Sequence, residues 1–403
     1  MRLENYNYIP LDQKILRLIN ETNVLTTILK KEPISRSSIT KITGLHKSTV
    51  SNIVDNFIKV GLIYEEGRGD SKLGKKPVNL WINEKYANYG IIDVQRRITT
   101  IAVCNLKGQV LNQKELSTMK NAESFFNKSA KKLSRMLHSF SDPLAGVSIV
   151  LPCPVNSMEG SIYWSDSLRW KKVPVKRIIE QHIDSNIFVE NDARAGALAE
   201  LFFGAAHDLT HFVFVLVCEG IGTGIVISKR IYYGAHSIVG EFGSVRHMIK
   251  KKYDESSGWT YWENIASDLA VVRRYCELAG EPFKKDIEGE MQRIINLVKS
   301  GDNHAKQALK ETARHLGECL ANVNWVLNPE HVIIGGKITQ VWDLIFPEMI
   351  AGVESQTPYE AVPIRDRFLP SLVNRPTFER SRALIFRNIL SGWEAHLTHE
   401  RKT

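Results

Sequence analysis

Acidic and amide side chains stand beside glycine-rich turns in the second half of the sequence, in a pattern that suits a small polar ligand. Ligand sites in α/β folds form where strands end and loops begin. The candidates at such positions are Asn191, Asp192, Glu241 and Glu263, and the glycine-rich segment 220–224 separates two predicted strands. None of these motifs is specific alone, because a segment such as 220–224 can equally be a tight hairpin. Their order along the chain predicts one shared site.

Short hydrogen-bonding and basic side chains gather near the N-terminus, where they suit contacts with DNA. Residues 46–60 predict a helix with an apolar inner stripe, while its outer face carries a lysine and small polar groups. The first turns of a recognition helix must reach base edges while its amides face phosphate, and no bulky apolar group prevents that here. The predicted DNA contacts are Arg36, Ser37, Lys47, Ser48, Thr49, Ser51, Asn52, Lys75 and Lys76.

Three predicted helices and two strands would position these contacts. Helical spacing of apolar residues predicts a first helix over 12–30, and a second over 35–43 ends at Gly44, where a C-cap needs positive φ. Two strands around the Gly- and Lys-rich segment 65–77 predict a wing, so the pattern is typical of a winged helix-turn-helix. A small helical bundle used for protein contact is the alternative. Ser48, Ser51 or Asn52 could each be a cap or a solvated residue instead of a base contact.

The remaining sequence has the pattern of an α/β fold, with sheet-rich segments first and helices later. Strands are predicted at 90–94, 98–103, 146–151, 187–192, 211–217, 224–227 and 332–334, and helices at 122–138, 193–203 and through most of 262–327. We therefore predict a DNA-binding domain over 1–85, one lobe over 86–200 and a second lobe over 201–403, whose final helix packs back.

The composition agrees with a basic head on a nearly balanced body. Residues 1–85 hold 14 Lys and Arg side chains against 9 Asp and Glu, whereas the other 318 residues hold 39 against 35. This asymmetry is expected when the head binds nucleic acid. No apolar run could span a membrane and the N-terminus lacks a secretory signal, so we expect a cytoplasmic protein. The five cysteines lack a CxxC pair, which predicts reduced, mostly buried thiols.

These motifs together resemble the ROK family of repressors, open reading frames and kinases, in its xylose- and N-acetylglucosamine-type repressor branch. The resemblance covers nearly the whole chain and implies a two-lobed actin/hexokinase-like fold with a sugar in the cleft. It rests on residues 18–25, 34–51, 74–77, 190–195, 220–225, 240–243, 262–267 and 333–338. At 74–77 the chain reads Gly-Lys-Lys-Pro, where family members usually have Gly-Arg-Arg-Pro.

The resemblance implies that the four acidic and amide residues bind sugar hydroxyls. Carboxylates and amides accept from and donate to vicinal hydroxyls, and such a pocket discriminates against ligands that lack them. The assignment covers Asn191, Asp192, Glu241 and Glu263. In kinases of the family the residue at Asp192 is also the general base that takes the hydroxyl proton.

The phosphate loop of the family kinases is degraded in this chain. The loop Asp-x-Gly-Gly-Thr should begin at Asp93, but the sequence reads Asp93-Val-Gln-Arg-Arg97. Without the glycines, backbone amides lose their close approach to phosphate. The glycines of 220–224 and Gly335-Gly336 persist, which could reflect turn geometry in the inherited fold. We predict no catalytic residue, no cofactor and no kinase activity.

The zinc site of the family also lacks its ligands. The family has His directly after Gly243 and then CxCGxxGC, whereas this chain has Ser244 and no cysteine through residue 261. Zinc needs about four N or S ligands, so we predict no structural metal, a solvated or core His247, and aromatic packing by Trp259, Tyr261 and Trp262. The segments 152–154 and 165–170 depart from the sugar-side pattern of the family, which leaves the sugar unidentified and even its binding open.

The whole sequence predicts a sugar-responsive transcriptional regulator, most simply a repressor of carbohydrate-utilisation genes. Two-fold symmetry would match a homodimer or tetramer to a palindromic double-stranded DNA operator. The effector would be a sugar or sugar phosphate. Two alternatives stay open: an active sugar kinase with a regulatory DNA-binding head, and a DNA-bound scaffold with a vestigial sensor that contacts another protein, such as a sugar-transport component.

Overall fold

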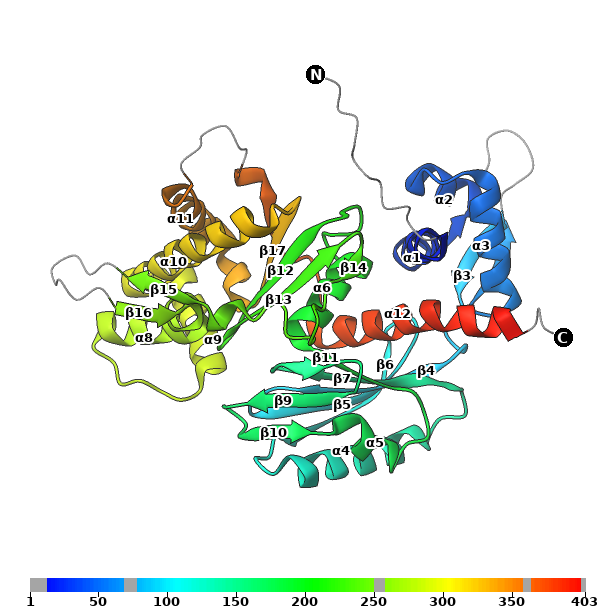
Figure 1. Ribbon diagram of the computed structural model, residues 1–403, viewed down its shortest axis with the longest axis horizontal. Helices are drawn as coiled ribbons and strands as arrows, with labels where there is room; N and C mark the ends of the chain where they lie inside the picture. Colours follow the sequence, from blue (N-terminus) through cyan, green and yellow to red (C-terminus); the bar gives the residue numbers. More distant parts are fainter. Residues whose placement is uncertain (1–12, 69–77, 250–257, 358–363, 400–403) are drawn as a thin grey trace, which may run out of the picture.

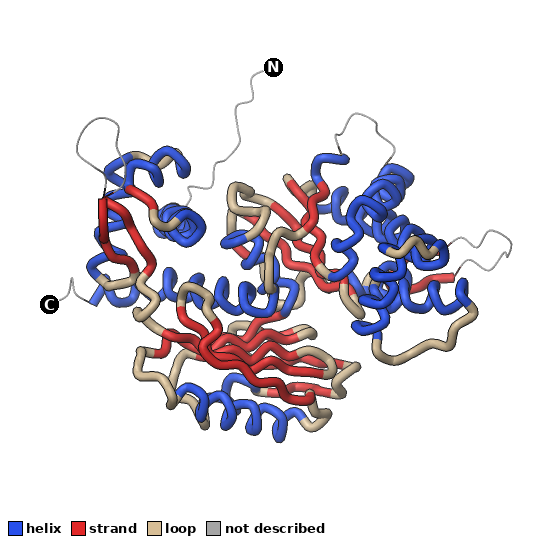
Figure 2. The backbone as a smooth tube through the Cα atoms, turned by 180° about the vertical axis from the view of Figure 1, so that it is seen from behind, coloured by secondary structure: helices blue, strands red, loops and turns tan. Residues whose placement is uncertain are grey.

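The computed structural model describes residues 13–68, 78–249, 258–357 and 364–399, which form a small N-terminal unit and two larger lobes (Figure 1). The N-terminal unit lies on one side of the long helix α12 (Pro376–His399), and the sheet of the first lobe lies on the other side. Seen from behind, each lobe consists of a sheet with helices packed against it (Figure 2). No helix in the described ranges is both long and apolar enough to cross a membrane.

The N-terminal unit has the three helices and the antiparallel strands that the sequence predicts. Its sheet has the order β1-β3-β2, and β2 and β3 flank residues 69–77. That segment, with the predicted contacts Lys75 and Lys76, lies outside the described residues. The elements are α1 (Gln13–Lys31), β1 (Ile34–Ser35), α2 (Arg36–Thr43), α3 (Lys47–Lys59), β2 (Ile63–Arg68) and β3 (Val78–Ile82).

Local capping fixes the turn between α2 and α3. The backbone N–H of Ser38 donates to Ser35 Oγ at 3.2 Å and begins α2. Gly44 ends that helix with φ of 68°, a left-handed conformation that glycine adopts without a Cβ penalty. The N-cap of α3 follows only two residues later, at His46. The inner stripe of α3 is buried at Val50, Ile53, Val54 and Phe57, and Ile58 is half-buried.

The first lobe contains a mixed five-stranded sheet of order β11-β7-β4-β5-β6. β4, β5 and β6 are antiparallel, whereas β7 and β11 run parallel to β4. Helix α4 packs on one face and α12 on the other, which buries β4 along its whole length. The elements are β4 (Asn88–Val94), β5 (Ile98–Asn105), β6 (Val110–Ser117), α4 (Ala122–Leu137), β7 (Leu144–Leu151), β8 (Val155–Asn156), β9 (Ser161–Ser165), β10 (Trp170–Val173), α5 (Val175–Glu180) and β11 (Ile187–Asn191).

The second lobe contains a five-stranded sheet of order β14-β13-β12-β17-β18, with most of the helices on it. Helix α6 (Asp192–Phe203) leads from the first lobe into it. The other elements are β12 (Phe212–Val217), β13 (Ile221–Ile227), β14 (Arg230–Ile231), η1 (Phe242–Ser244), β15 (Arg246–Ile249), β16 (Gly258–Tyr261), α7 (Trp262–Ala266), α8 (Asp268–Ala279), α9 (Ile287–Lys299), α10 (Asn303–Leu327), β17 (His331–Gly335), η2 (Lys337–Val341), α11 (Trp342–Ser355), η3 (Arg365–Arg367) and β18 (Phe368–Pro370).

The glycine-rich segment 220–224 is part of an antiparallel hairpin, β12–β13, on which α6 lies very closely. A Cβ at Gly224 would stand 2.6 Å from the Cβ of Ala197, and one at Gly222 would stand 2.9 Å from the Cβ of Ala193. Both glycines are therefore required by helix-to-hairpin packing, whether or not a nucleotide binds.

One continuous apolar core joins the N-terminal unit, the first-lobe sheet, α6 and α12. Its buried members include Leu25 of α1, Phe57 of α3, Phe202 of α6 and Phe386 of α12. The final helix packs against α1, α6, β4 and β7. The N-terminal unit is consequently packed against the body and not attached only through its linker.

The hairpin β15–β16 differs from the predicted aromatic packing. Trp262 is buried and stacks on Phe242 with ring centroids 5.5 Å apart, but Trp259 and Tyr261 are 63% and 42% exposed. Side chains alternate across a strand, and these two point to the open face of the hairpin. The prediction was therefore wrong for Trp259 and Tyr261. His247 is half-buried, with Nε2 3.8 Å from Glu318 Oε2.

Candidate functional site

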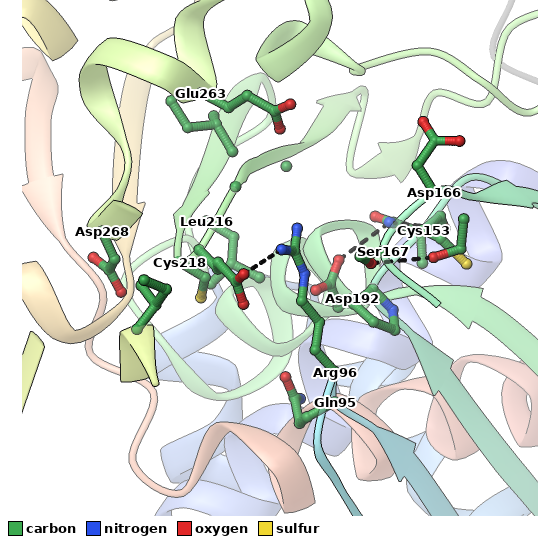
Figure 3. Close-up of a pocket in the computed structure, with 18 of the residues that line it drawn as sticks. Gln95, Arg96, Cys153, Asp166, Ser167, Asp192, Leu216, Cys218, Glu263 and Asp268 are labelled. Carbon is green, nitrogen blue, oxygen red and sulfur yellow. Dashed lines mark hydrogen bonds and ion pairs between the residues drawn. The ribbon is translucent and has the colours of Figure 1, made fainter. Parts of the chain in front are cut away.

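A polar cleft of about 290 Å³ lies between the two lobes, and all four predicted ligand residues line it. Figure 3 shows two of them, Asp192 and Glu263. The first lobe contributes the ends of β4, β7 and β11, and the second lobe contributes the β12–β13 turn and the starts of α7, α8 and α9. Strand ends from both lobes thus converge on one cavity. The predicted residues in its lining are Asn191, Asp192, Glu241 and Glu263.

Asn191 and Asp192 have different tasks in the cleft. Asn191 Oδ1 accepts from the backbone N–H groups of Ala193 and Arg194, at 3.0 and 3.1 Å, and so caps α6. Its Nδ2 donates to Cys153 O and to Asp192 Oδ1. Since these bonds use the amide of Asn191, this residue positions Asp192. Asp192 Oδ2 has no hydrogen-bond partner within the described ranges and is the oxygen free for a ligand.

Acidic side chains predominate in the cleft lining, and burial raises the pKa of several of them. Burial raises the pKa of Glu241 to about 7, against the effect of Arg194, with Asp192 and Glu263 adding to the rise. Burial also raises the pKa of Asp192 and of Glu263, which Arg380 and Arg96 respectively oppose. A cluster of shifted acids in a cleft is typical of a functional site.

The segment that replaces the phosphate loop spans the cleft with two ion pairs. Arg96 Nη1 lies 2.5 Å from Glu219 Oε1 on the β12–β13 turn, and Arg97 Nη1 lies 3.1 Å from Asp286 Oδ1 at the start of α9. Figure 3 shows Arg96 pointing into the cleft, between Asp192 and Cys218. The arginines that stand in place of the loop therefore connect the first lobe to the second.

Asp93, the first residue of the same segment, is buried and paired with a residue from the far end of the chain. Its Oδ2 lies 3.2 Å from Arg380 Nη2 on α12, and its Oδ1 accepts from Gln95 Nε2 at 2.7 Å. Burial raises the pKa of Asp93, with Arg380 opposing the rise. The carboxylate of Asp93 is therefore held in an ion pair with α12.

Glu190 lies next to Asn191 and forms hydrogen bonds and ion pairs with residues of several elements. Its Oε1 accepts from Arg194 Nε at 2.7 Å, and its Oε2 accepts from the Tyr233 hydroxyl at 2.8 Å. Arg387 of α12 donates to Tyr233 and lies 3.7 Å from Glu190 Oε2. Burial opposes ionisation, but Arg194 and Arg387 outweigh it and leave the pKa of Glu190 lowered. The network connects the cleft to α12.

Asp268 is a cleft residue that the sequence analysis missed. It begins α8 and is 4% exposed, and among the described residues its buried Oδ1 has no hydrogen-bond partner. Burial raises its pKa to about 7, while Lys337 opposes the rise. In the sequence it looks like an ordinary first-turn acid of a helix, so only its burial distinguishes it.

The Asp268→Asn variant is expected to be more stable than the wild type, and more so at pH 8 than at pH 5. The pKa of Asp268 is raised in the folded state, so its ionisation costs stability progressively as pH rises from about 4 towards 7. Each pKa unit is worth about 1.4 kcal/mol, so the gain at pH 8 is roughly 2–4 kcal/mol. Urea unfolding at both pH values measures it, with exposed Asp343→Asn at the start of α11 as the control. Equal gains at both pH values would contradict the assignment.

The predicted DNA contacts within the described residues lie on α2 and on the first turns of α3. Ser37, Lys47, Ser48 and Asn52 are exposed, while Arg36, Thr49 and Ser51 are half-buried. Some are engaged within the protein. Ser48 Oγ lies 2.8 Å from His46 Nδ1, and Ser37 Oγ lies 2.9 Å from Ser35 Oγ.

Arg36 has partners on two neighbouring elements. Its Nη1 lies 2.7 Å from Asp55 Oδ1 on α3, and its Nη2 lies 2.9 Å from Glu65 Oε1 on β2. These pairs brace α3 against the sheet, a role that the sequence did not indicate because both carboxylates are remote in the chain. The guanidinium would have to leave them to reach a phosphate.

The fold and the cleft define a two-lobed α/β ligand-binding protein with a helical N-terminal unit. The sequence model of the ROK family matches residues 89–364 of this chain, which therefore belongs to the ROK family. A putative xylose repressor from Caldicellulosiruptor sp. (strain Rt8B.4) is 30% identical over 348 residues, covering 83% of this chain and 87% of that protein. The xylose repressor of Bacillus subtilis (strain 168) is 29% identical, covering 93% and 97%.

Solved structures confirm the predicted two-lobed ROK fold. A ROK family transcriptional regulator, a homologue of the E. coli MLC protein, has a TM-score of 0.72 at 25% identity and covers 94% of this chain and 98% of its own. Because 94% of this chain is matched, the match includes the N-terminal unit as well as the two lobes. The ROK glucokinase from Streptomyces griseus, in complex with glucose and AMPPNP, has a TM-score of 0.62 at 22% identity and covers 74% and 97%. At this identity the glucokinase shows the fold alone.

Proposed function

We propose that the chain is a sugar-responsive transcriptional repressor with a winged helix-turn-helix head and a cleft that senses a sugar without phosphorylating it. One observation carries the proposal: Asp192, Glu241 and Glu263 line the cleft with Asn191 holding Asp192 in place, while the segment at the phosphate-loop position forms two ion pairs between the lobes. Relatives named xylose repressor and N-acetylglucosamine repressor support the regulatory role.

In the cleft, the free oxygen of Asp192 accepts from a sugar hydroxyl. Glu241 and Glu263 offer further carboxylates from the opposite lobe, so a sugar bound to all three holds the lobes in one relative position. A ligand shifts a two-state equilibrium only when it binds the two states with different affinity. Contacts from both lobes supply that difference, because they can all form in one lobe arrangement only.

The signal reaches the head through α12. Arg380 and Arg387 of this helix contact Asp93 and the Glu190 network at the cleft, and Phe386 packs in the core that includes α1 and α3. A change in the relative position of the lobes would therefore move or strain α12, against which the N-terminal head packs. In a homodimer or tetramer this alters the spacing of two heads on a palindromic operator.

The kinase alternative rests on the retained Asp192. Against it, the loop at 93–97 has no glycine to admit phosphate, Asp93 is paired with Arg380, and the two arginines are paired across the cleft. A coupled ATPase assay with a panel of sugars separates the two, and turnover would favour the kinase. The scaffold alternative is favoured if no sugar changes the thermal stability of the protein.

Lys47→Ala is expected to weaken operator binding uniformly across DNA sequences. Lys47 is exposed at the first position of α3, where it can neutralise one phosphate. The plot of log K against log salt has a negative slope, and the loss of one phosphate contact makes that slope less steep by about 0.9. Fluorescence anisotropy at several salt concentrations measures the slope. The control is Lys131→Ala, an exposed lysine on α4, and an unchanged slope for Lys47→Ala would remove Lys47 from the interface.

A further inference from the structure

A second cavity, of about 560 Å³, lies where the N-terminal unit meets both lobes. This junction cavity shares no lining residue with the cleft in the described part of the chain. Its walls come from α1 in the head, from β11 in the first lobe, from β14 in the second lobe, and from α6 and α12 between them. The volume falls within the roughly 300–1,000 Å³ of small-molecule sites.

The inner wall of the junction cavity is apolar. Leu198, Leu201 and Phe202 of α6 line it and are almost fully buried, and Val189 of β11 lies beside them. Ile231 of β14 is half-buried and also lines the cavity. An apolar cavity of this size offers water few hydrogen-bond partners, so an apolar ligand replaces water there at a gain.

The polar side of the same cavity is cationic. Four basic residues line it, and among the described residues no Asp or Glu does; the four are Lys176, Lys229, Arg230 and Arg387. Lys229 donates to His207 O at 2.8 Å and to Asn23 Oδ1 at 3.2 Å. Arg387 is shared with Glu190. Arg230 is exposed at the rim and, within the described ranges, has no carboxylate within 4.0 Å. The mouth therefore attracts an anion.

We propose that the junction cavity binds a small amphipathic carboxylate, with its hydrocarbon body against α6 and its carboxylate at Arg230. Apolar burial supplies the affinity, and a charge-assisted hydrogen bond to a guanidinium fixes the orientation. The site is separate from the sugar cleft and does not depend on the sugar-sensing role. Because Ile19 of α1 also lines the cavity, a bound molecule touches the head and both lobes at once.

Titration of the full chain with octanoate, decanoate and dodecanoate tests the site, with the alcohols of the same lengths as matched neutral ligands. Calorimetry is done below micelle-forming concentrations. Each added methylene is expected to tighten binding about fourfold, the value for transfer of a buried CH₂ out of water. Each carboxylate is expected to bind at least about tenfold more tightly than its alcohol, because hydrogen bonds to charged groups are the stronger ones.

Two variants locate the binding. Ile231→Trp places a bulky ring in the lining and narrows the cavity, and it is expected to weaken decanoate binding more than about tenfold. Arg230→Gln is expected to reduce decanoate affinity to that of decanol. The matched controls are Tyr232→Trp, the next residue along the chain and outside the lining, and Arg177→Gln on α5; both should bind decanoate as the wild type does.

Absence of saturable binding by the wild type, full affinity in Ile231→Trp, or equal affinity for carboxylates and alcohols would each overturn the proposal. Circular dichroism confirms that each variant is folded. Decanoate binding by Asp192→Asn should equal that of the wild type, so a failure of the junction site and a failure of the sugar site are seen separately.

Discussion

Asp192→Asn is expected to weaken sugar binding by about 10- to 150-fold while leaving operator binding unchanged. The variant removes a charged acceptor from the cleft, and hydrogen bonds to charged groups contribute about 1.5–3 kcal/mol each. The local fold should survive, because an Asn oxygen can still accept from the backbone N–H of Ala193 as Asp192 Oδ1 does at 2.8 Å. Calorimetric titration with a panel of sugars measures the loss.

The matched control is Asp184→Asn, an exposed acid in the same lobe outside the cleft lining. It removes the same charge from the chain and should leave sugar affinity untouched. Wild-type sugar affinity in Asp192→Asn would mean that the sugar does not use this carboxylate, and it would contradict the assignment of the cleft as the sugar site.

Arg380→Met is expected to lower the free energy of unfolding by about 3–5 kcal/mol, the usual result when one partner of a buried ion pair is removed. Asp93 would keep Gln95 as its donor but lose its only ion-pair partner within the described residues. The loss should shrink at pH 5, because burial raises the pKa of Asp93 and an unpaired Asp93 becomes protonated more readily still. Urea unfolding at pH 5 and pH 8 measures both effects.

The double variant Asp93→Asn/Arg380→Met should regain much of the lost stability, since no buried charge is left without a partner. Arg365→Met, at a residue whose side chain is 69% exposed, is the control and should change stability little. If the double variant is no more stable than Arg380→Met, then Asp93 and Arg380 are not coupled. In that case the connection between the cleft and α12 would rest on Arg387 alone.

Residues close in sequence to a capping or strand-end signal were predicted best. Gly44 fixes the end of α2, and the strand ends at Asn191 and Gly220 converge as parallel and hairpin topology requires. The hairpin explanation of 220–224, which the sequence left open beside a phosphate-binding role, accounts for those glycines through the packing of α6. In each case a few neighbouring residues determine the local structure.

Contacts between residues that are far apart in the chain could not be predicted from the sequence. Arg380 stands 287 positions from Asp93, and nothing local marks either residue as half of a buried pair. Asp268 looks like a first-turn helical acid until its burial is known. Trp259 and Tyr261 were expected to pack in place of the missing zinc site, yet the register of the two-stranded hairpin turns them outward. Tertiary packing decides these positions.

The central claim, that a sugar in the cleft controls DNA binding by the head, is tested most directly by fluorescence anisotropy. The full chain is titrated onto labelled DNA from upstream of its own gene, at two salt concentrations, with and without each sugar and sugar phosphate of a panel. The account predicts salt-sensitive binding that one sugar changes by about 5–150-fold, the usual range of allosteric coupling. Specific binding that no sugar alters, or no DNA binding at all, would contradict it.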